Sequence, residues 1–211
     1  MAKEKVFIDK LKFEKEEIAK GHKLIAGVDE VGRGPLAGPV CVACVIMPLE
    51  NCDLIEGIDD SKKVSEKKRE ALAEKIKEKA IAYSIQMVEP KVIDEINILQ
   101  ATKLCMKKAI ESMKVKPDIV LVDAINSLDV DVLVRGIIKG DALSYCIGAA
   151  SILAKVERDN LMKKLAEKYP DYGFDRNKGY GTKEHIEALK KVGITEHHRR
   201  SFLKFLNGEN K

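Results

Sequence analysis

The sequence contains no tryptophan, and aromatic residues make up only 5% of its 211 positions. A glycosidase stacks sugars on aromatic rings, so this scarcity argues against that class of enzyme. No window approaches the roughly 18 consecutive apolar residues of a membrane-spanning helix. The opening stretch MAKEKVFIDKLKFEKEEIAKG also lacks the apolar segment of a secretory leader. These absences exclude a transmembrane protein and predict a cytoplasmic one.

Cysteines are few and odd in number, at positions 41, 44, 52, 105 and 146, which predicts reduced thiols. Cys41 and Cys44 form a CxxC pattern, but residues three positions apart on a strand face opposite sides. No second CxxC accompanies them, so core cysteines are favoured over a zinc site. His197 and His198 are not spaced as ligands on one helical face, which favours a surface or hydrogen-bonded pair.

Neither sign of charge dominates, since 38 Lys and Arg residues face 34 Asp and Glu residues. Any attraction to a polyanion must therefore come from local clusters. Basic residues gather in SKKVSEKKR, in RNKGYGTK and in HHRR. Such clusters are usually solvated surface, but around an acidic site that holds a metal they would suit a nuclease.

Hydrophobic periodicity predicts an α/β layer fold with a mixed sheet. The expected helices span residues 4–20, 66–80, 90–114, 144–169 and 183–193. The expected strands span residues 23–31, 37–47, 81–88, 118–124 and 131–140. Neither an internal repeat nor a low-complexity linker interrupts the sequence. We therefore expect one domain over residues 1–211, with a helical extension over 1–20 and a mainly helical part from about 144 to 211.

The stretch VDEVGRGPLAGPV places Asp29 and Glu30 before a glycine-rich run. GRGPLA matches a dinucleotide-binding pattern, but the segment that follows is strand-like, where that motif needs a helix. Two interpretations stay open. The acids can bind a divalent cation while the bare amides of Gly32 and Gly34 admit a sugar-phosphate backbone, or the acids end a strand and the glycines form a turn.

Two further acids favour the first interpretation. Asp123 and Asp141 each follow an apolar run, so strands would deliver them to a shared edge of the sheet, although Asp141 could also be a helix cap. Four acids without Cys or His at ligand spacing favour an oxygen-only site for Mg²⁺ or Mn²⁺. Because Asp29 and Glu30 are adjacent, an ideal strand turns them to opposite faces. Both can reach one site only if the chain twists or leaves the strand by Glu30.

Several motifs in order resemble a known family, bacterial type 2 ribonuclease H, also called ribonuclease HII. They are AGVDEVGRGPLAGPV, DDSKKVSEKKRE, NILQATKLCM, LVDA, KGD followed by AASILAKVERD, and KGYGTKEHIEAL with HHRRSF. The resemblance implies a ribonuclease H-like α/β fold, with a mixed five-stranded sheet flanked by helices and a helical C-terminal part. The related type 3 enzymes carry an extra N-terminal domain, for which the residues before Gly21 leave no room.

The resemblance also implies an activity, which is cleavage of the RNA strand of RNA–DNA hybrids and nicking of DNA duplexes 5′ of an embedded ribonucleotide. It implies two-metal-ion hydrolysis with Mg²⁺ or Mn²⁺ and products with 3′-hydroxyl and 5′-phosphate ends. We expect a monomer. The residues implied as catalytic metal ligands are Asp29, Glu30, Asp123 and Asp141. Those implied as substrate contacts are Gly32, Arg33 and Gly34 at the 2′-hydroxyl, Tyr180 at the following deoxyribose, and Lys62, Ser151 and Lys155 at phosphates.

Two other functions compete with this one. The chain could be another metal-dependent nuclease of the same fold, such as an integrase-like or junction-resolving enzyme. It could also be a non-catalytic nucleic-acid-binding module, but four acids at strand ends would repel DNA when no metal is bound.

Overall fold

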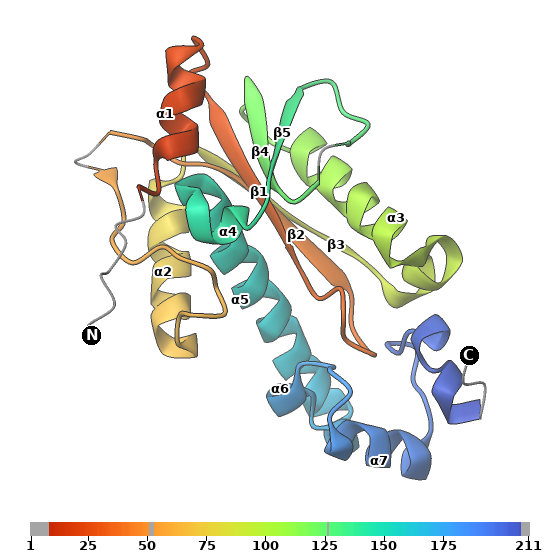
Figure 1. The fold of residues 1–211 in the computed structure, drawn as a ribbon. Helices are drawn as coiled ribbons and strands as arrows, with labels where there is room; N and C mark the ends of the chain where they lie inside the picture. Colours follow the sequence, from red (N-terminus) through yellow and green to blue (C-terminus); the bar gives the residue numbers. More distant parts are fainter. Residues whose placement is uncertain (1–8, 51–52, 126, 208–211) are drawn as a thin grey trace, which may run out of the picture.

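A mixed five-stranded sheet forms the centre of the molecule (Figure 1), described by a computed structural model over residues 9–50, 53–125 and 127–207. The strands are β1 (Ile25–Val31), β2 (Val40–Ile46), β3 (Ala82–Val88), β4 (Ile119–Asp123) and β5 (Leu133–Ile137), in the order β3-β2-β1-β4-β5. Strand β2 pairs antiparallel with both β1 and β3, whereas β4 runs parallel to both β1 and β5. The expected mixed five-stranded α/β sheet is confirmed.

Helices cover both faces of the sheet (Figure 1). They are α1 (Lys12–Ala19), α2 (Glu66–Lys79), α3 (Pro90–Glu111), α4 (Gly140–Leu143), α5 (Tyr145–Lys168), α6 (Phe174–Asn177) and α7 (Lys183–Val192). Short 3₁₀ turns span Pro170–Tyr172, Arg200–Phe202 and Lys204–Asn207. Helix α3 packs on one face of β2 and β3, and α5 packs on the other face against β1 and β2. None of the helices described is long and apolar enough to cross a membrane.

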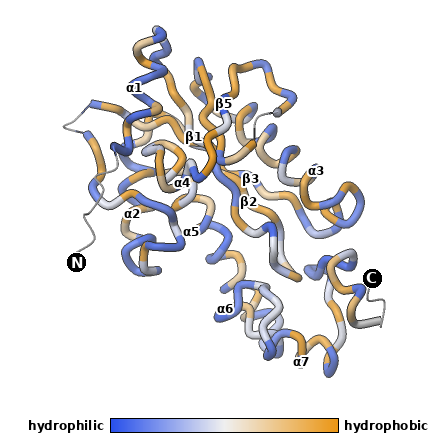
Figure 2. The backbone as a smooth tube through the Cα atoms, viewed as in Figure 1, coloured by the Kyte–Doolittle hydropathy of each residue, from blue (hydrophilic) through white to orange (hydrophobic). Residues whose placement is uncertain are grey.

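Strand β2 is buried along its whole length because it lies between these two helical layers, and it is uniformly hydrophobic in Figure 2. Cys44 belongs to the core on the α3 side and Cys41 to the core on the α5 side, as strand alternation predicts. Burial raises the pKa of Cys44 to about 12, so this thiol stays protonated. Cys105 and Cys146 are also buried, and Cys52 lies outside the described residues.

The part after α5 is helical as expected and has its own small core. Phe174 is buried there among Met162, Leu189 and Leu203, and Ala37 joins them from the segment between β1 and β2. The C-terminal part therefore packs directly against the glycine-rich segment. In Figure 1, α6 and α7 lie beyond the end of α5.

Element boundaries differ modestly from the expected ones. The N-terminal helix begins at Lys12, and the expected residues 4–8 lie outside the described part of the chain. Ser65 occupies the N-cap position of α2, but its side chain makes no capping hydrogen bond. Strand β5 ends at Ile137, because the chain turns through a left-handed conformation at Lys139 into α4.

Candidate active site

Two of the predicted acids lie level on neighbouring parallel strands. Val28 of β1 pairs with Val122 of β4, so Asp29 and Asp123 follow at the same height. Oδ1 of Asp29 accepts a hydrogen bond of 2.8 Å from the amide of Glu30, and the hydroxyl of Ser151 in α5 acts to lower the pKa of Asp29. Asp123 accepts a hydrogen bond of 2.7 Å from the amide of Gly140 in α4. Both carboxylates thus face the helical layer that contains α4 and α5.

Glu30 lies within strand β1. Regular pairing of β1 with β2 continues to Val31, so the chain does not leave the strand by Glu30. Of the two expected routes to a shared site, leaving the strand is therefore excluded and a twist of the strand remains, since the pairing with β4 stops at Val28. By alternation Glu30 points to the α3 side, opposite Asp29. The strand end is open toward β4. Burial raises the pKa of Glu30, the guanidinium of Arg33 acts against this rise, and the charge of Asp123 adds to it.

The negative charges of neighbouring acids raise one another's pKa values. Burial raises the pKa of Asp29 well above its usual range, and the charges of Glu30 and Asp123 raise it further. Burial also raises the pKa of Asp123, against the hydrogen bond from Gly140, and the nearby charge of Asp141 adds to the rise. These carboxylates are therefore close enough to repel one another when ionised.

Asp141 lies in the first turn of α4 and not at the end of a strand. Its Oδ1 accepts a 2.8 Å hydrogen bond from the amide of Ala142, which is the behaviour of an acid in the first turn of a helix. Its charge nonetheless acts on Asp123. Both interpretations of Asp141 thus find support, since it borders the acidic group and also stabilises a helix start.

The donor set fits a divalent cation in its chemistry. Oε2 of Glu30 is buried without a hydrogen-bond partner, while its Oε1 lies 3.3 Å from the guanidinium of Arg33. A bound cation would give the unpartnered carboxylate oxygen a ligand and would offset the repulsion between the acids. Within the described residues, no three acidic, histidine or cysteine side chains converge closely enough to hold an ion as they stand. Binding therefore requires the carboxylates to turn toward a common point.

The predicted phosphate contacts divide into two groups. Lys62 is exposed. Its charge offsets part of the rise in the pKa of Asp123, so Lys62 lies near the acids. Ser151 is buried, and its hydroxyl lies 3.0 Å from that of Ser61. The ammonium of Lys155 is held by Asp159 of the next helical turn at 2.7 Å. Lys62 thus stands free at the surface, whereas Ser151 and Lys155 are engaged inside the protein.

The segment between β1 and β2 is fixed by two buried arginines that sequence reasoning did not single out. The guanidinium of Arg199 donates to the carbonyls of Gly32, Arg33 and Gly38 at 2.6 to 3.0 Å. Burial and the charge of Arg158 lower the pKa of Arg199 to about 9, which leaves it charged at neutral pH.

The second arginine, Arg158 of α5, holds the other end of this segment. It donates to the carbonyls of Ala37 and Pro39 and to that of Lys178 in the loop that carries Tyr180. The motifs KVERD and HHRR contain both arginines, but nothing in their spacing shows that these side chains are completely buried.

Tyr180 stands beside the glycine-rich segment. The amide of Leu36 donates to the carbonyl of Gly179 at 2.8 Å, which joins the two loops. A methyl group at Gly34 would lie 3.6 Å from Cε1 of Tyr180. Tyr180 as a residue is 44% exposed, so it is accessible to a ligand. The structure thus brings Gly34 and Tyr180 together, as a shared recognition surface requires.

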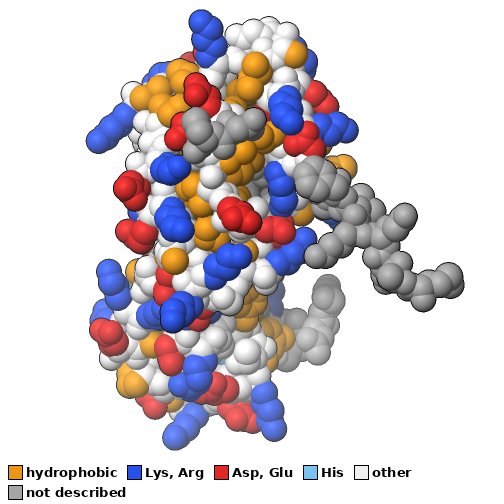
Figure 3. Space-filling view, turned by 90° about the vertical axis from the view of Figure 1, so that its left-hand side faces the viewer, with side chains coloured by type: hydrophobic (Ala, Val, Ile, Leu, Met, Phe, Trp, Pro, Cys, Tyr) orange, Lys and Arg blue, Asp and Glu red, His pale blue; other side chains and the backbone are white. Residues whose placement is uncertain are grey.

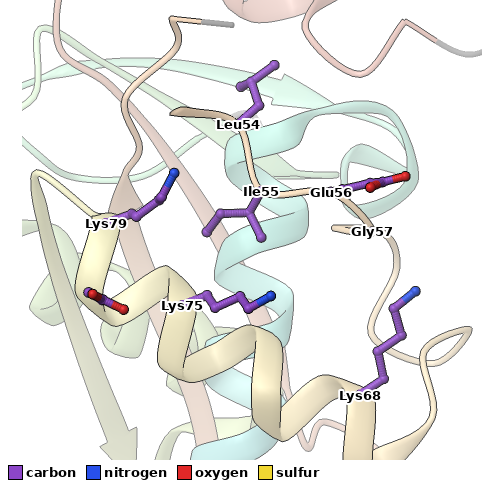
Figure 4. A pocket seen from close by; sticks show the side chains of 8 residues that line it. Leu54, Ile55, Glu56, Gly57, Lys68, Lys75 and Lys79 are labelled. Carbon is purple, nitrogen blue, oxygen red and sulfur yellow. The ribbon is translucent and has the colours of Figure 1, made fainter. Parts of the chain in front are cut away.

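The acidic site is distinct from a pocket of about 690 Å³ between α2 and the segment 54–57, which Lys68, Lys75 and Lys79 border (Figure 4). None of the four predicted acids lines this pocket. On the face shown in Figure 3, Lys and Arg alternate with Asp and Glu, so no stripe of one sign forms there.

Comparison with known proteins decides the family. The sequence profile described as Ribonuclease HII matches residues 26–205. The chain belongs to the ribonuclease HII family. Ribonuclease HII of Caldicellulosiruptor bescii is 56% identical over 194 residues, which cover 91% of this chain and 93% of that protein. Ribonuclease HII of Bacillus subtilis is 53% identical over 205 residues, which cover 95% and 79%.

Solved structures agree with the fold. Ribonuclease H2 of Pyrococcus horikoshii is 30% identical with a TM-score of 0.74, covering 89% of this chain and all of that one. Ribonuclease HII of Archaeoglobus fulgidus, solved in a complex with PCNA, is 31% identical with a TM-score of 0.72, covering 84% and 94%. The ribonuclease H-like fold is confirmed, and the chain is a nuclease of the ribonuclease H type that acts on nucleic acid.

Proposed function

We propose that this ribonuclease HII cleaves the RNA strand of RNA–DNA hybrids and nicks DNA duplexes on the 5′ side of an embedded ribonucleotide. The observation that carries the proposal is the group of buried, mutually repelling acids at the ends of β1 and β4, with Oε2 of Glu30 unpartnered. Such a group is unfavourable by itself and becomes favourable around a hard cation.

In this proposal Asp29, Glu30, Asp123 and Asp141 hold two divalent ions, Mg²⁺ or Mn²⁺. When bound, these ions supply an activated water and compensate charge at the departing 3′-oxygen. The hydrogen bonds from the amide of Glu30 to Asp29 and from the amide of Gly140 to Asp123 orient the two carboxylates that lie level on the sheet. Water is the nucleophile in place of any side chain, and it replaces the 3′-oxygen at phosphorus, so the products carry 3′-hydroxyl and 5′-phosphate ends.

The ribonucleotide is recognised by the glycine-rich segment and the loop that carries Tyr180, which are joined by a hydrogen bond. Gly34 is exposed and bears no side chain, so its backbone can approach the 2′-hydroxyl of the substrate. Arg33 is exposed beside it, and the ring of Tyr180 stacks on the following deoxyribose. Lys62 contacts a phosphate near the acids. Ser151 and Lys155 act through their neighbours Asp29 and Asp159, which modifies the direct phosphate contact implied by resemblance.

One experiment separates this function from its rivals. Three labelled duplexes are compared with Mg²⁺, with Mn²⁺ and with EDTA: DNA with one embedded ribonucleotide, DNA alone, and an RNA–DNA hybrid. We expect metal-dependent nicking of the first on the 5′ side of the ribonucleotide, cleavage of the hybrid, and no cleavage of DNA alone. End analysis checks for the 3′-hydroxyl and 5′-phosphate.

Each rival predicts a different result. Equal cleavage of the DNA duplex indicates a junction-resolving or integrase-like nuclease. Binding to all three duplexes without cleavage under any metal indicates a non-catalytic module. Light scattering on the same preparation tests the expected monomer, and a stable dimer contradicts it.

A further inference from the structure

Two buried histidines form a hydrogen-bonded chain that ends on the backbone of Tyr180. Nδ1 of His185 lies 2.9 Å from the carbonyl oxygen of Tyr180, and its Nε2 lies 3.1 Å from Nε2 of His198. Nδ1 of His198 lies 2.9 Å from both the amide and the hydroxyl of Thr195. His185 is completely buried and His198 is 2% exposed.

The direction of every hydrogen bond in this chain follows from its two ends. The amide of Thr195 can only donate, so Nδ1 of His198 is the acceptor and carries no proton. The proton of a neutral His198 is then on Nε2, which donates to Nε2 of His185. This leaves the proton of His185 on Nδ1, where it donates to the carbonyl of Tyr180, which can only accept. One pair of tautomers satisfies all the contacts.

A proton added to either ring would break the chain. A charged His198 would point an N–H at the amide of Thr195, and a charged His185 would point one at the N–H of His198. The surroundings also favour neutral rings, since Tyr172 and Phe174 pack against both of them. Burial lowers the pKa of both histidines, and the charge of His185 further lowers that of His198.

The chain is coupled to the recognition loops from both ends. Its acceptor, the Tyr180 carbonyl, lies between Gly179, which is bonded to Leu36, and Gly181. At the other end, the residue after His198 is Arg199, which holds the carbonyls of Gly32 and Arg33. The histidines therefore connect the loop that carries Tyr180 to the segment that anchors the glycine-rich loop.

We infer that His185 and His198 are positioning residues for substrate recognition, which hold the Tyr180 backbone through a chain of fixed direction and so aim its ring at the sugar beside a ribonucleotide. The inference rests on the proposed function of Tyr180. A metal site is a poorer account of the pair, because Nδ1 of each ring is already engaged and the described residues supply no cluster of three ligands.

The first test is independent of activity. Nitrogen-15 NMR of the labelled protein at pH 7 distinguishes the two tautomers of each histidine. We expect the Nδ1–H tautomer for His185 and the Nε2–H tautomer for His198. The opposite tautomer at either position, or a charged ring, overturns the inference.

The second test uses a matched pair of variants. The amide of asparagine reaches the Nδ1 position of histidine and that of glutamine reaches Nε2, so His185→Asn keeps the donor to Tyr180 and His185→Gln loses it. We expect His185→Gln to lower kcat/KM on the one-ribonucleotide duplex by about fivefold to tenfold, the worth of one hydrogen bond. His185→Asn should stay within about twofold to threefold of the parent, and thermal melting tests that both fold.

A double-mutant cycle tests whether the effect passes through the tyrosine ring. In a Tyr180→Ala background, His185→Gln should change kcat/KM by less than about twofold, because the ring it positions is absent. An equal loss with and without the ring shows that His185 is merely structural and overturns the inference. The outcome is separable from the proposed function, since a parent that fails to nick the one-ribonucleotide duplex refutes that function while the NMR test still stands.

Discussion

Asp29 and Asp123 lie level on adjacent parallel strands, each one residue beyond the last mutual pair of β1 and β4, and both face the layer of α4 and α5. Parallel strands end at the same edge of a sheet, so this arrangement follows directly from the topology. It keeps the two carboxylates close together at a place where water cannot fully solvate either of them.

Neutralising either of these acids should separate activity from stability. We expect Asp29→Asn and Asp123→Asn each to lower cleavage by at least about 100-fold. Because the folded state raises both pKa values, ionisation opposes folding, and this penalty is felt as pH rises through the folded pKa. Both variants should therefore melt at a higher temperature than the parent at neutral pH without metal.

The control for that prediction is the thermal shift on adding Mg²⁺ or Mn²⁺. The parent should be stabilised by either ion, and the two variants should respond much less. Turnover of the hybrid by either variant with Mg²⁺, at a rate near that of the parent, contradicts the assignment of these acids.

Tyr180 provides a test of recognition apart from chemistry. Tyr180→Ala should lose about 1–3 kcal/mol of transition-state stabilisation on the one-ribonucleotide duplex, by analogy with aromatic stacking on bases. Tyr180→Phe should keep most of the stacking contribution. The measurement is kcat/KM, with the metal-induced thermal shift as a control that should not change. A folded Tyr180→Ala that nicks as fast as the parent shows that the ring is structural.

Two glycines of the same loop should respond differently to a methyl group. At Gly32 a Cβ would lie 2.2 Å from Nε of the buried Arg158, and the φ angle of +90° disfavours alanine. Gly32→Ala should therefore destabilise the fold by about 1–3 kcal/mol. At Gly34 the added Cβ meets only the Tyr180 ring, at an ordinary 3.6 Å.

Gly34→Ala should thus fold normally and lose at least about tenfold in nicking, because the methyl group occupies space proposed for the ribose. Melting temperatures and nicking rates of the two variants check both statements. If Gly34→Ala nicks as well as the parent, the substrate does not approach the backbone at that residue.

Arg199→Lys should loosen the glycine-rich loop without affecting the acids. A lysine cannot reproduce the forked contacts to Gly32, Arg33 and Gly38, so one or more buried carbonyls lose their donor. We expect a loss of about 1–3 kcal/mol in the free energy of unfolding. Discrimination between one-ribonucleotide and DNA duplexes should fall, while Mg²⁺ still raises the melting temperature. An unchanged discrimination ratio contradicts the anchoring role.

His198 should make stability depend on pH. The folded state lowers its pKa from an ordinary 6.5 to about 4, mainly by burial. The contribution of His198 to the free energy of unfolding is therefore complete above pH 6.5. It is lost as pH falls toward 4, by about 3 kcal/mol at most. Urea titrations should show this loss in the parent and a smaller one in His198→Gln, which cannot titrate. If the free energy of unfolding changes with pH in the same way in both proteins, His198 is not the source of the pH dependence.

Much of the fold could be predicted from the sequence because its signals are local. The continuous apolar run of β2 predicts a strand buried on both faces, and the strand alternation of Cys41 and Cys44 is confirmed. The acids of β1 and β4 could be placed together because they follow apolar runs, and parallel strands bring such ends to one edge.

The interior contacts of the loops could not be predicted in this way. Arg158 and Arg199 look like surface charges in sequence, since nothing local shows that distant carbonyls surround them. His185 pairs with His198 across thirteen residues, whereas the sequence offered only the adjacent pair His197 and His198. Which of the two expected courses the chain takes at Glu30 could not be chosen from sequence for a related reason, because β1 loses its partner on one side only.

The order in which the ribosome makes these parts gives the arginine contacts a consequence for biosynthesis. The four acids lie within the first 141 residues, whereas Arg199, which holds the glycine-rich loop, is added much later. Because chains emerge from their N-terminus, the carboxylates are exposed to the cell before the element proposed to select the substrate has its anchor. The proposed selectivity is thus complete only after Arg199 has been translated.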